Sequence, residues 1–211
     1  MRKVFIDCGA HDGCSVRKFL DITEDGAEYE VYSFEPNPKL AHHHPVGDAV
    51  FYDKAVWTSD GPHTFYMHGT TGGSTLVEEK NTHNTLKAQS RPSIMKVQGL
   101  PEAITVECID ISKWISTKFA KEDYIVLKMD IEGAEYQILD KMIAEGTIDY
   151  INEFAVEWHL LTSQGVAPPL RKHIKQQIGE HTQLFEQKGI KLIEWDAMHT
   201  PYLLDLTSTV G

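Results

Sequence analysis

The run YIVLKM at residues 124–129 constrains the fold of this chain more than any other feature of the sequence. Strands at the centre of a parallel sheet are buried on both faces, and they carry continuous apolar runs in place of an alternating pattern. The run KVFIDC at residues 3–8 is of the same kind, and apolar residues at helical spacing follow both runs. Strands that alternate with helices are typical of an α/β fold with a mostly parallel sheet.

The same patterns predict the other elements. We expect strands at residues 3–8, 29–34, 49–57, 104–108, 124–129, 148–158, 190–195 and 201–206, and a hairpin partner of the third strand at residues 63–67. Apolar spacing predicts helices at residues 13–20, 111–119 and 131–142, and a fourth that begins at Pro168 and stops at Gly189. Asp110 is the expected N-cap of the second helix.

Residues 68–101 depart from these patterns. They begin with HGTTGGST, contain few apolar residues and show no clear period. Irregular chain of this length inside a compact domain is usually either functional or disordered. We therefore expect a mobile lid or acceptor-binding loop there, within a single domain of residues 1–211.

Charge and apolar content exclude several classes of protein. The chain has 31 acidic and 20 basic residues, and its formal net charge of −11 repels nucleic acid and anionic lipid. No stretch approaches the roughly 20 apolar residues of a membrane helix, and the first apolar run is too short for a signal peptide. The three cysteines lack metal-site spacing, which suits free thiols. We expect a cytoplasmic protein with no nucleic-acid partner and no membrane insertion.

The first candidate site is DCGAHDG at residues 7–13, between the first strand and the first helix. Glycines there let the backbone approach a ligand closely, and the helix N-terminus favours a negative group. A dinucleotide-binding turn reads Gly-x-Gly-x-x-Gly, but Asp7 stands in place of the first glycine. A carboxylate is unfavourable beside a pyrophosphate, whereas it suits the ammonium group of S-adenosylmethionine. A tight turn without a ligand is the alternative.

The second candidate site is Glu35-Pro36-Asn37, at the end of the second strand. An acidic residue at this place can accept hydrogen bonds from both ribose hydroxyls of an adenosine ligand. A solvated glutamate at a strand end is the alternative. Together with the glycine turn, the glutamate favours an adenosine-containing cofactor.

The third candidate site is LKMDIEGAE at residues 127–135, where the predicted central strand ends. Asp130 should point into the crevice in which open α/β sheets bind their ligands. Glu132 belongs either to that crevice or to the first turn of the next helix. We expect Glu135 in that first turn, where a carboxylate complements the helix dipole.

The fourth candidate site is Glu157-Trp158-His159, at the end of the strand expected beside Asp130. Strand alternation sends Glu157 and His159 to one side and Trp158 to the other. A neutral imidazole can accept a hydroxyl proton near pH 7, so His159 is the candidate general base, with Asp130 orienting the imidazole or the acceptor. A structural histidine is the alternative.

These four motifs, DxGAxxG, FEPNP, LKMDIEGAE and VEWH, follow one another between residues 4 and 159. In that order they resemble the FkbM family of S-adenosylmethionine-dependent methyltransferases. The resemblance implies a class I methyltransferase fold, which is a Rossmann-like three-layer sandwich. Its seven-stranded sheet is mostly parallel, with an antiparallel last strand. The family's characterised members are mostly O-methyltransferases of natural products and sugars.

The resemblance also implies which residues line the cofactor. These are Asp7, Gly9, Ala10, His11 and Gly13 at the methionine end, Glu35, Pro36 and Asn37 at the ribose, Lys54 and Ala55 at the adenine, and Ser74, Thr75 and Asp130 near the cofactor. His11 is a departure, because the family often has asparagine there. The catalytic candidates are Asp130, Glu132, Glu157 and His159, and this carboxylate-rich group could also hold Mg²⁺ or another divalent ion.

The sequence therefore predicts methyl transfer from S-adenosylmethionine to a hydroxyl of a small molecule, sugar or glycan. Two alternatives remain. One is an NAD(P)-dependent oxidoreductase or epimerase of nucleotide sugars, which Asp7 and the lack of a Tyr-x-x-x-Lys pair disfavour. The other is a cofactor-binding module without catalytic activity.

Overall fold

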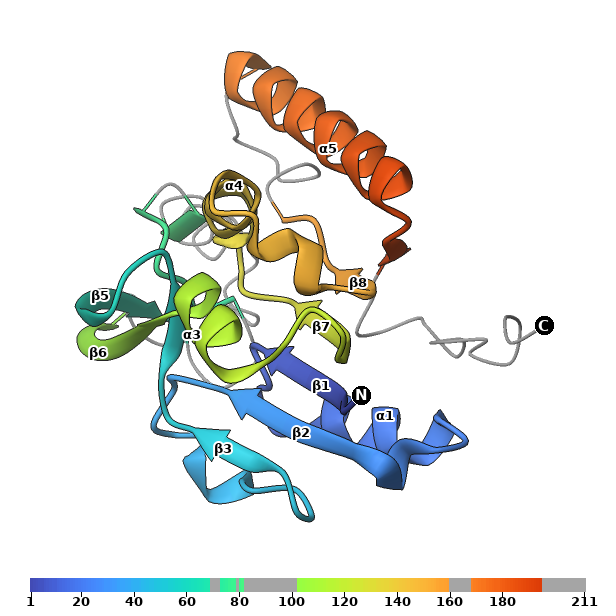
Figure 1. The fold of residues 1–211 in the computed structure, drawn as a ribbon. Coiled ribbons are helices and arrows are strands. Elements are labelled where there is room, and N and C mark those ends of the chain that lie inside the picture. Colours follow the sequence, from blue (N-terminus) through green and yellow to red (C-terminus); the bar gives the residue numbers. More distant parts are fainter. Residues whose placement is uncertain (69–72, 79, 82–101, 160–167, 195–211) are drawn as a thin grey trace.

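The computed structural model describes residues 1–68, 73–78, 80–81, 102–159 and 168–194 (Figure 1). The strands of the central sheet are β1 (Lys3–Cys8), β2 (Tyr29–Phe34), β3 (Val50–Tyr52), β7 (Tyr124–Met129), β8 (Glu153–Val156) and β9 (Lys191–Glu194). A smaller sheet contains β4 (Ala55–Trp57), β5 (Gly61–Met67) and β6 (Glu102–Asp110). The helices are α1 (Cys14–Ile22), α3 (Ile111–Lys118), α4 (Glu135–Ala144) and α5 (Pro168–Lys188). Three short 3-10 turns are η1 (Gly26–Glu28), η2 (Ala41–His43) and η4 (Thr147–Tyr150).

The central sheet confirms the predicted Rossmann-like α/β class. Its strand order is β3-β2-β1-β7-β8-β9, and every neighbouring pair is parallel. The described part of the chain contributes six strands to this sheet instead of the expected seven. The last predicted strand, at residues 201–206, lies outside the described residues.

The prediction for residues 49–67 is wrong in two respects. The single strand expected at residues 49–57 is divided into β3 and β4, which belong to different sheets. The antiparallel partner of β5 is β6, which also pairs in parallel with β4. Buried residues of these three strands form a small core of their own, in which Phe65 and Met67 of β5 pack with Val106 and Cys108 of β6. The pattern of apolar residues identifies a strand but not its partner.

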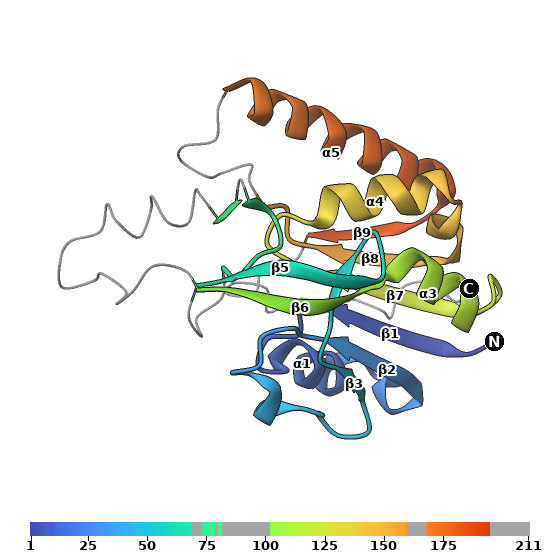
Figure 2. The ribbon, with the colours of Figure 1, turned by 90° about the vertical axis from the view of Figure 1, so that its left-hand side faces the viewer.

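Each face of the central sheet is covered by different helices. Phe5 packs with Val16 and Phe19 of α1 on one face. Its neighbours Val4 and Ile6 belong to a larger core on the other face, together with residues of α3, α4 and α5. Figure 2 shows α4 and α5 stacked beside the β8–β9 end of the sheet. No described helix combines the length and the apolar character that a membrane span requires.

Local signals account for the helix ends. The side chain of Asp110 accepts a hydrogen bond from the amide of Lys113 at 3.2 Å, which confirms the predicted N-cap of α3. The helix α5 ends before Gly189, whose φ of 71° is left-handed and suits a glycine after a helix.

The sheet register brings the candidate sites together. Cys8, at the end of β1, lies between Phe34 of β2 and Met129 of β7, and Met129 lies opposite Val156 of β8. The segments that follow these strands therefore leave the sheet at one edge. The chain runs outward from β1 toward β3 and then from β7 toward β9, so β1 and β7 form the switch point where such sheets bind ligands.

Candidate active site

The turn after β1 requires glycine at two positions. Gly9 and Gly13 have φ values of 83° and 80°, in the left-handed region that other residues rarely adopt. A Cβ atom on Gly9 would lie 2.0 Å from the carbonyl oxygen of Asp130, and one on Gly13 would lie 2.4 Å from Val46. The amides of Gly9 and Ala10 both donate to the carbonyl of Phe34 at 3.0 Å. The turn is therefore held directly against the ends of β2 and β7.

Glu35 ties this turn to the end of β2. One carboxylate oxygen accepts the amide of His11 at 2.9 Å and the other accepts the amide of Asn37 at 2.8 Å. The residue is 7% exposed, and burial raises the pKa of its carboxyl group. Each carboxylate oxygen has a second lone pair, so Glu35 retains capacity for one further hydrogen bond on each oxygen.

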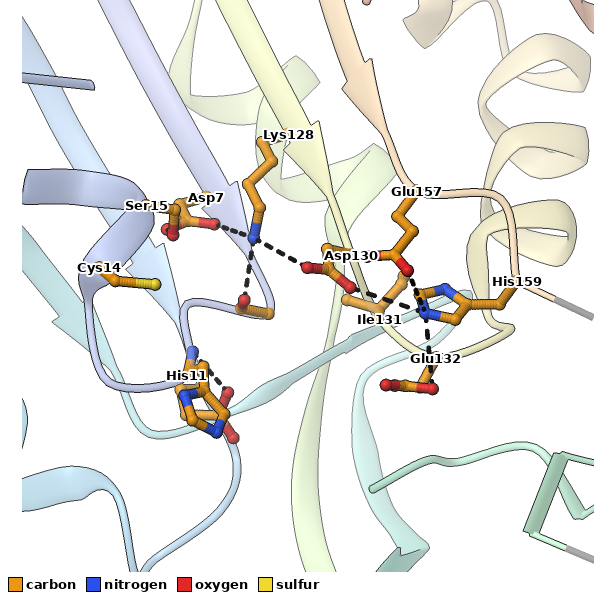
Figure 3. A network of polar contacts seen from close by, with 12 residues as sticks. Asp7, His11, Cys14, Ser15, Lys128, Asp130, Ile131, Glu132, Glu157 and His159 are labelled. Carbon is orange, nitrogen blue, oxygen red and sulfur yellow. Dashed lines mark hydrogen bonds and ion pairs between the residues drawn. The ribbon is translucent and has the colours of Figure 1, made fainter. Parts of the chain in front are cut away.

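Asp7 has an internal partner that the sequence did not reveal. Its carboxylate is fully buried, lies 2.8 Å from Nζ of Lys128 and accepts a hydrogen bond from the hydroxyl of Ser15. Lys128 also donates to the carbonyl of Gly9 at 3.0 Å and lies 3.9 Å from a carboxylate oxygen of Asp130 (Figure 3). Burial works to lower the pKa of Lys128, but Asp7 and Asp130 raise it above its ordinary value. The ammonium group beside Asp7 is therefore one that the protein itself provides.

Four predicted catalytic residues meet at the next strand ends. The Nε2 atom of His159 lies 3.5 Å from Glu132, 3.6 Å from Glu157 and 3.8 Å from Asp130 (Figure 3). Trp158, which like His159 lies beyond the end of β8, stacks on Tyr136 of α4. The imidazole is buried at 8% exposure, whereas the side chain of Glu157 is 40% exposed, so the cluster opens to solvent on the Glu157 side.

Glu135 holds the imidazole of His159 in place. Its Oε1 lies 2.8 Å from Nδ1 of His159. Its oxygens also accept the amides of Ile131 and Gly133, at 3.0 and 2.9 Å. Glu135 occupies the first turn of α4, as predicted, but sequence reasoning missed its contact with His159. The sequence predicted that Glu135 complements the helix dipole, but it did not predict a contact with His159, which lies 24 residues further along the chain.

The charge state of the cluster differs from the expectation of a neutral imidazole near pH 7. Burial works to lower the pKa of His159, but the charge and hydrogen bond of Glu135, together with Glu132, raise it to about 9. Burial raises the pKa of Glu157 to about 7, and repulsion from Asp130 adds to this shift. Burial also raises the pKa of Asp130. Near pH 7 these shifts favour a protonated imidazole on His159 and a Glu157 carboxyl group that is only partly ionised.

The remaining predicted cofactor residues have partners of their own. Ser74 accepts the amide of His68 at 3.0 Å, and the hydroxyl of Thr75 donates to the carbonyl of Glu132 at 2.8 Å. Ala55 is buried in the small core of β4, β5 and β6, directly after the half-buried Lys54. Among the residues expected at the ribose, Asn37 is buried and Pro36 is partly exposed.

Part of the cluster also has the spacing of a cation site. Asp130, Glu157 and His159 each offer one ligand atom, and these atoms lie within 4.8 Å of one another. Carboxylate and imidazole ligands together suit Mg²⁺, Mn²⁺ or Zn²⁺. Nδ1 of His159 faces the buried carboxylate of Glu135, and a metal-binding histidine usually has such a partner on the nitrogen that does not bind the metal.

An open parallel sheet with a glycine turn and an acid–histidine cluster at its switch point places the protein in the Rossmann-like α/β class. A family model described as the methyltransferase FkbM domain matches residues 7–192. The chain therefore belongs to the FkbM methyltransferase family, and its activity is methyl transfer. Searches among curated proteins and among solved structures find no match.

Proposed function

We propose that this protein transfers a methyl group from S-adenosylmethionine to a hydroxyl group of a sugar or glycan. Methyl transfer follows from the family, and the pair of His159 and Glu135 is the observation that supports an oxygen acceptor. A hydroxyl group must lose its proton as the new bond forms, and an oriented imidazole is a suitable acceptor for that proton. An acceptor without an acidic proton would not need this pair.

The glycine turn and Glu35 fit an adenosine cofactor. When bound, S-adenosylmethionine supplies a methyl group that is already activated on a sulfonium. Glu35 has free lone pairs to accept hydrogen bonds from ribose hydroxyls, and the N-terminus of α1 favours a carboxylate. Asp7 contributes indirectly, since it fixes Lys128 under the turn. Asp130 lies at the junction of this turn and the histidine cluster.

The acidic cluster would then act on the acceptor. Because Glu135 accepts the Nδ1–H of His159, the other nitrogen, Nε2, takes the hydroxyl proton once it has lost its own, a loss that the raised pKa of His159 shifts to higher pH. Asp130, Glu132 and Glu157 surround that nitrogen, so they are placed to orient the hydroxyl and to stabilise the imidazolium after proton transfer. The acceptor oxygen would take the methyl group as its proton passes to Nε2 of His159, and the sulfonium–methyl bond would break to leave a neutral thioether.

A neutral acceptor rich in hydroxyl groups fits the electrostatics. The chain carries a formal net charge of −11, which disfavours a polyanionic acceptor. Carboxylates are common partners of sugar hydroxyls because they accept strong hydrogen bonds. A sugar or glycan is therefore the acceptor class that we propose.

Two measurements test this function. Calorimetry should show binding of S-adenosylmethionine and no comparable binding of NAD⁺, the cofactor of the oxidoreductase alternative. Mass spectrometry should then show a single added methyl group on a member of a panel of mono- and oligosaccharides. A fully O-methylated version of the same sugar is the control and should remain unchanged. Binding without methylation of any member would favour the non-catalytic module.

A divalent cation is a second candidate for activating the hydroxyl. The ligand atoms of Asp130, Glu157 and His159 lie close enough together to hold one. A coordinated hydroxyl group would lose its proton more readily, and His159 would then be a ligand instead of a base.

A further inference from the structure

Glu132 anchors a separate part of the chain, residues 73–78 and 80–81, to the active site. The amide of Gly73 donates to Oε1 of Glu132 at 2.9 Å, and the hydroxyl of Thr75 donates to the Glu132 carbonyl at 2.8 Å. Nζ of Lys80 lies 3.0 Å from Oε2 of Glu132. We call these four residues the Glu132 anchor.

The anchor is a built feature and not a chance surface contact. Lys80 and Thr75 are 7% and 1% exposed. Thr75 also exchanges two backbone hydrogen bonds with Tyr66 at the end of β5, at 2.9 and 3.0 Å. Glu132 has a left-handed φ of 57°, which is uncommon for a residue other than glycine and persists only where surrounding contacts hold it.

One oxygen atom connects the anchor to the histidine cluster. Oε2 of Glu132 faces both Nζ of Lys80, at 3.0 Å, and Nε2 of His159, at 3.5 Å. The other oxygen is occupied by the amide of Gly73, so the carboxylate has a single orientation. The side chain of Lys80 is 8% exposed and that of Glu132 22% exposed in this pair, and a largely buried ion pair adds little stability compared with an apolar pair but can fix geometry.

We propose that Lys80 is a positioning residue for methyl transfer, because its ammonium group fixes the Glu132 carboxylate beside Nε2 of His159. The proposal rests on the proposed function of the cluster. It adds Lys80, a residue outside the four sequence motifs, to the residues that serve the reaction. Lys80 acts through Glu132 and needs no contact with the acceptor.

The first test is independent of any acceptor. In Lys80→Met, the Gly73 amide should exchange its hydrogen on the order of tenfold faster, because the oxygen that accepts it is no longer held. Lys80→Arg should restore slow exchange, since a guanidinium can make the same ion pair. The control is Lys113→Met, which removes an exposed ion pair to Asp60 and should leave Gly73 unchanged. Unchanged exchange in Lys80→Met would overturn the proposal.

The second test uses a double-mutant cycle with a sugar that the glycan panel identifies. Lys80→Met should lower kcat about tenfold, in the range seen when a supporting residue is lost, while the affinity for S-adenosylmethionine stays within about twofold. Lys80→Met combined with Glu132→Gln should be no slower than Glu132→Gln alone. The proposal would be overturned if the two substitutions lowered kcat independently, so that their fold-changes multiplied in the double variant. A loss of affinity for S-adenosylmethionine that matches the loss in kcat would also overturn it. If no sugar is methylated, the proposed function fails, whereas the exchange result still decides whether Lys80 fixes Glu132.

Discussion

Nδ1 of His159 lies 2.8 Å from Oε1 of Glu135, in a contact that joins the segment after β8 to the first turn of α4. Glu135 is fully buried and also accepts the amides of Ile131 and Gly133, so it cannot turn away. A carboxylate only accepts hydrogen bonds, which places the hydrogen of the pair on Nδ1. Nε2 is then directed at the other carboxylates of the cluster.

Replacing His159 by alanine should remove the general base. We expect turnover to fall by roughly 10²–10⁴, the range typical of a lost base. The affinity for S-adenosylmethionine should stay nearly the same, because the imidazole faces the acceptor side of the cluster. Steady-state kinetics and calorimetry on the same variant check both points. Near-normal turnover would make His159 structural.

The pH dependence should follow the imidazole of His159. Its pKa is raised from 6.5 to about 9 in the free protein, and a base must be unprotonated, so the rate should rise with pH toward 9. The same shift predicts that the protonated imidazole stabilises the fold below pH 6.5 and that this contribution is lost as the pH rises through about 9. Initial rates and urea unfolding across this range measure the two effects.

Glu135→Gln is the matched variant for the pH profile. It removes the charge that raises the pKa of His159, so the midpoint of the rate profile should move to lower pH. An unshifted midpoint would mean that another group controls the rate.

Glu35→Ala should weaken cofactor binding. Loss of two ribose hydrogen bonds lowers the affinity for S-adenosylmethionine by about tenfold or more. Because Glu35 also accepts the buried amides of His11 and Asn37, the free energy of unfolding should fall by about 1–3 kcal/mol. Glu30→Ala, at an exposed position of β2, the strand that Glu35 follows, is the control and should leave the affinity unchanged. Unchanged affinity in Glu35→Ala would contradict the ribose assignment.

Lys128→Met should be among the more destabilising single changes in this protein. It leaves Asp7 buried without its counter-ion, which lowers the free energy of unfolding by about 3–5 kcal/mol. Asp7→Asn combined with Lys128→Met removes both charges and should be less destabilising than Lys128→Met alone. Urea denaturation of the three variants measures these differences, and additive losses would argue against a direct pair.

A bound cation would change the role of the cluster. If Asp130, Glu157 and His159 hold a divalent ion, treatment with EDTA should abolish methyl transfer and Mg²⁺ or Mn²⁺ should restore it. If His159 is the base, EDTA should leave the rate within about twofold, since no step needs the ion. Atomic absorption on the purified protein gives an independent count of bound metal.

Several elements could be predicted from the sequence because their signals are local. The continuous apolar runs of β1 and β7 and the strand β2 were assigned to the residue. The cap at Asp110 depends on one side chain and an amide three residues later. The clustering of Asp130 with His159 also followed, because parallel strands that lie next to each other end at the same edge.

Strand pairing in the smaller sheet could not be predicted in this way. β5 and β6 are separated in sequence by residues 68–101, and β4 was taken for the end of β3. Whether two half-buried strands pair depends on which apolar faces meet, as in the small core around Phe65 and Val106. A pattern along one strand does not contain that information.

The sequence by itself determined which residue types stand at the ends of the parallel strands, because periodicity and glycine turns are properties of adjacent residues. Only the tertiary structure decided their partners. It paired Asp7 with Lys128, Glu132 with Lys80 and His159 with Glu135. Each pair joins segments distant in the chain, and each is selected by burial, since a charge removed from water must find a counter-charge or a hydrogen bond within reach. That requirement acts only after the chain has folded, so it leaves no periodic signal in the sequence.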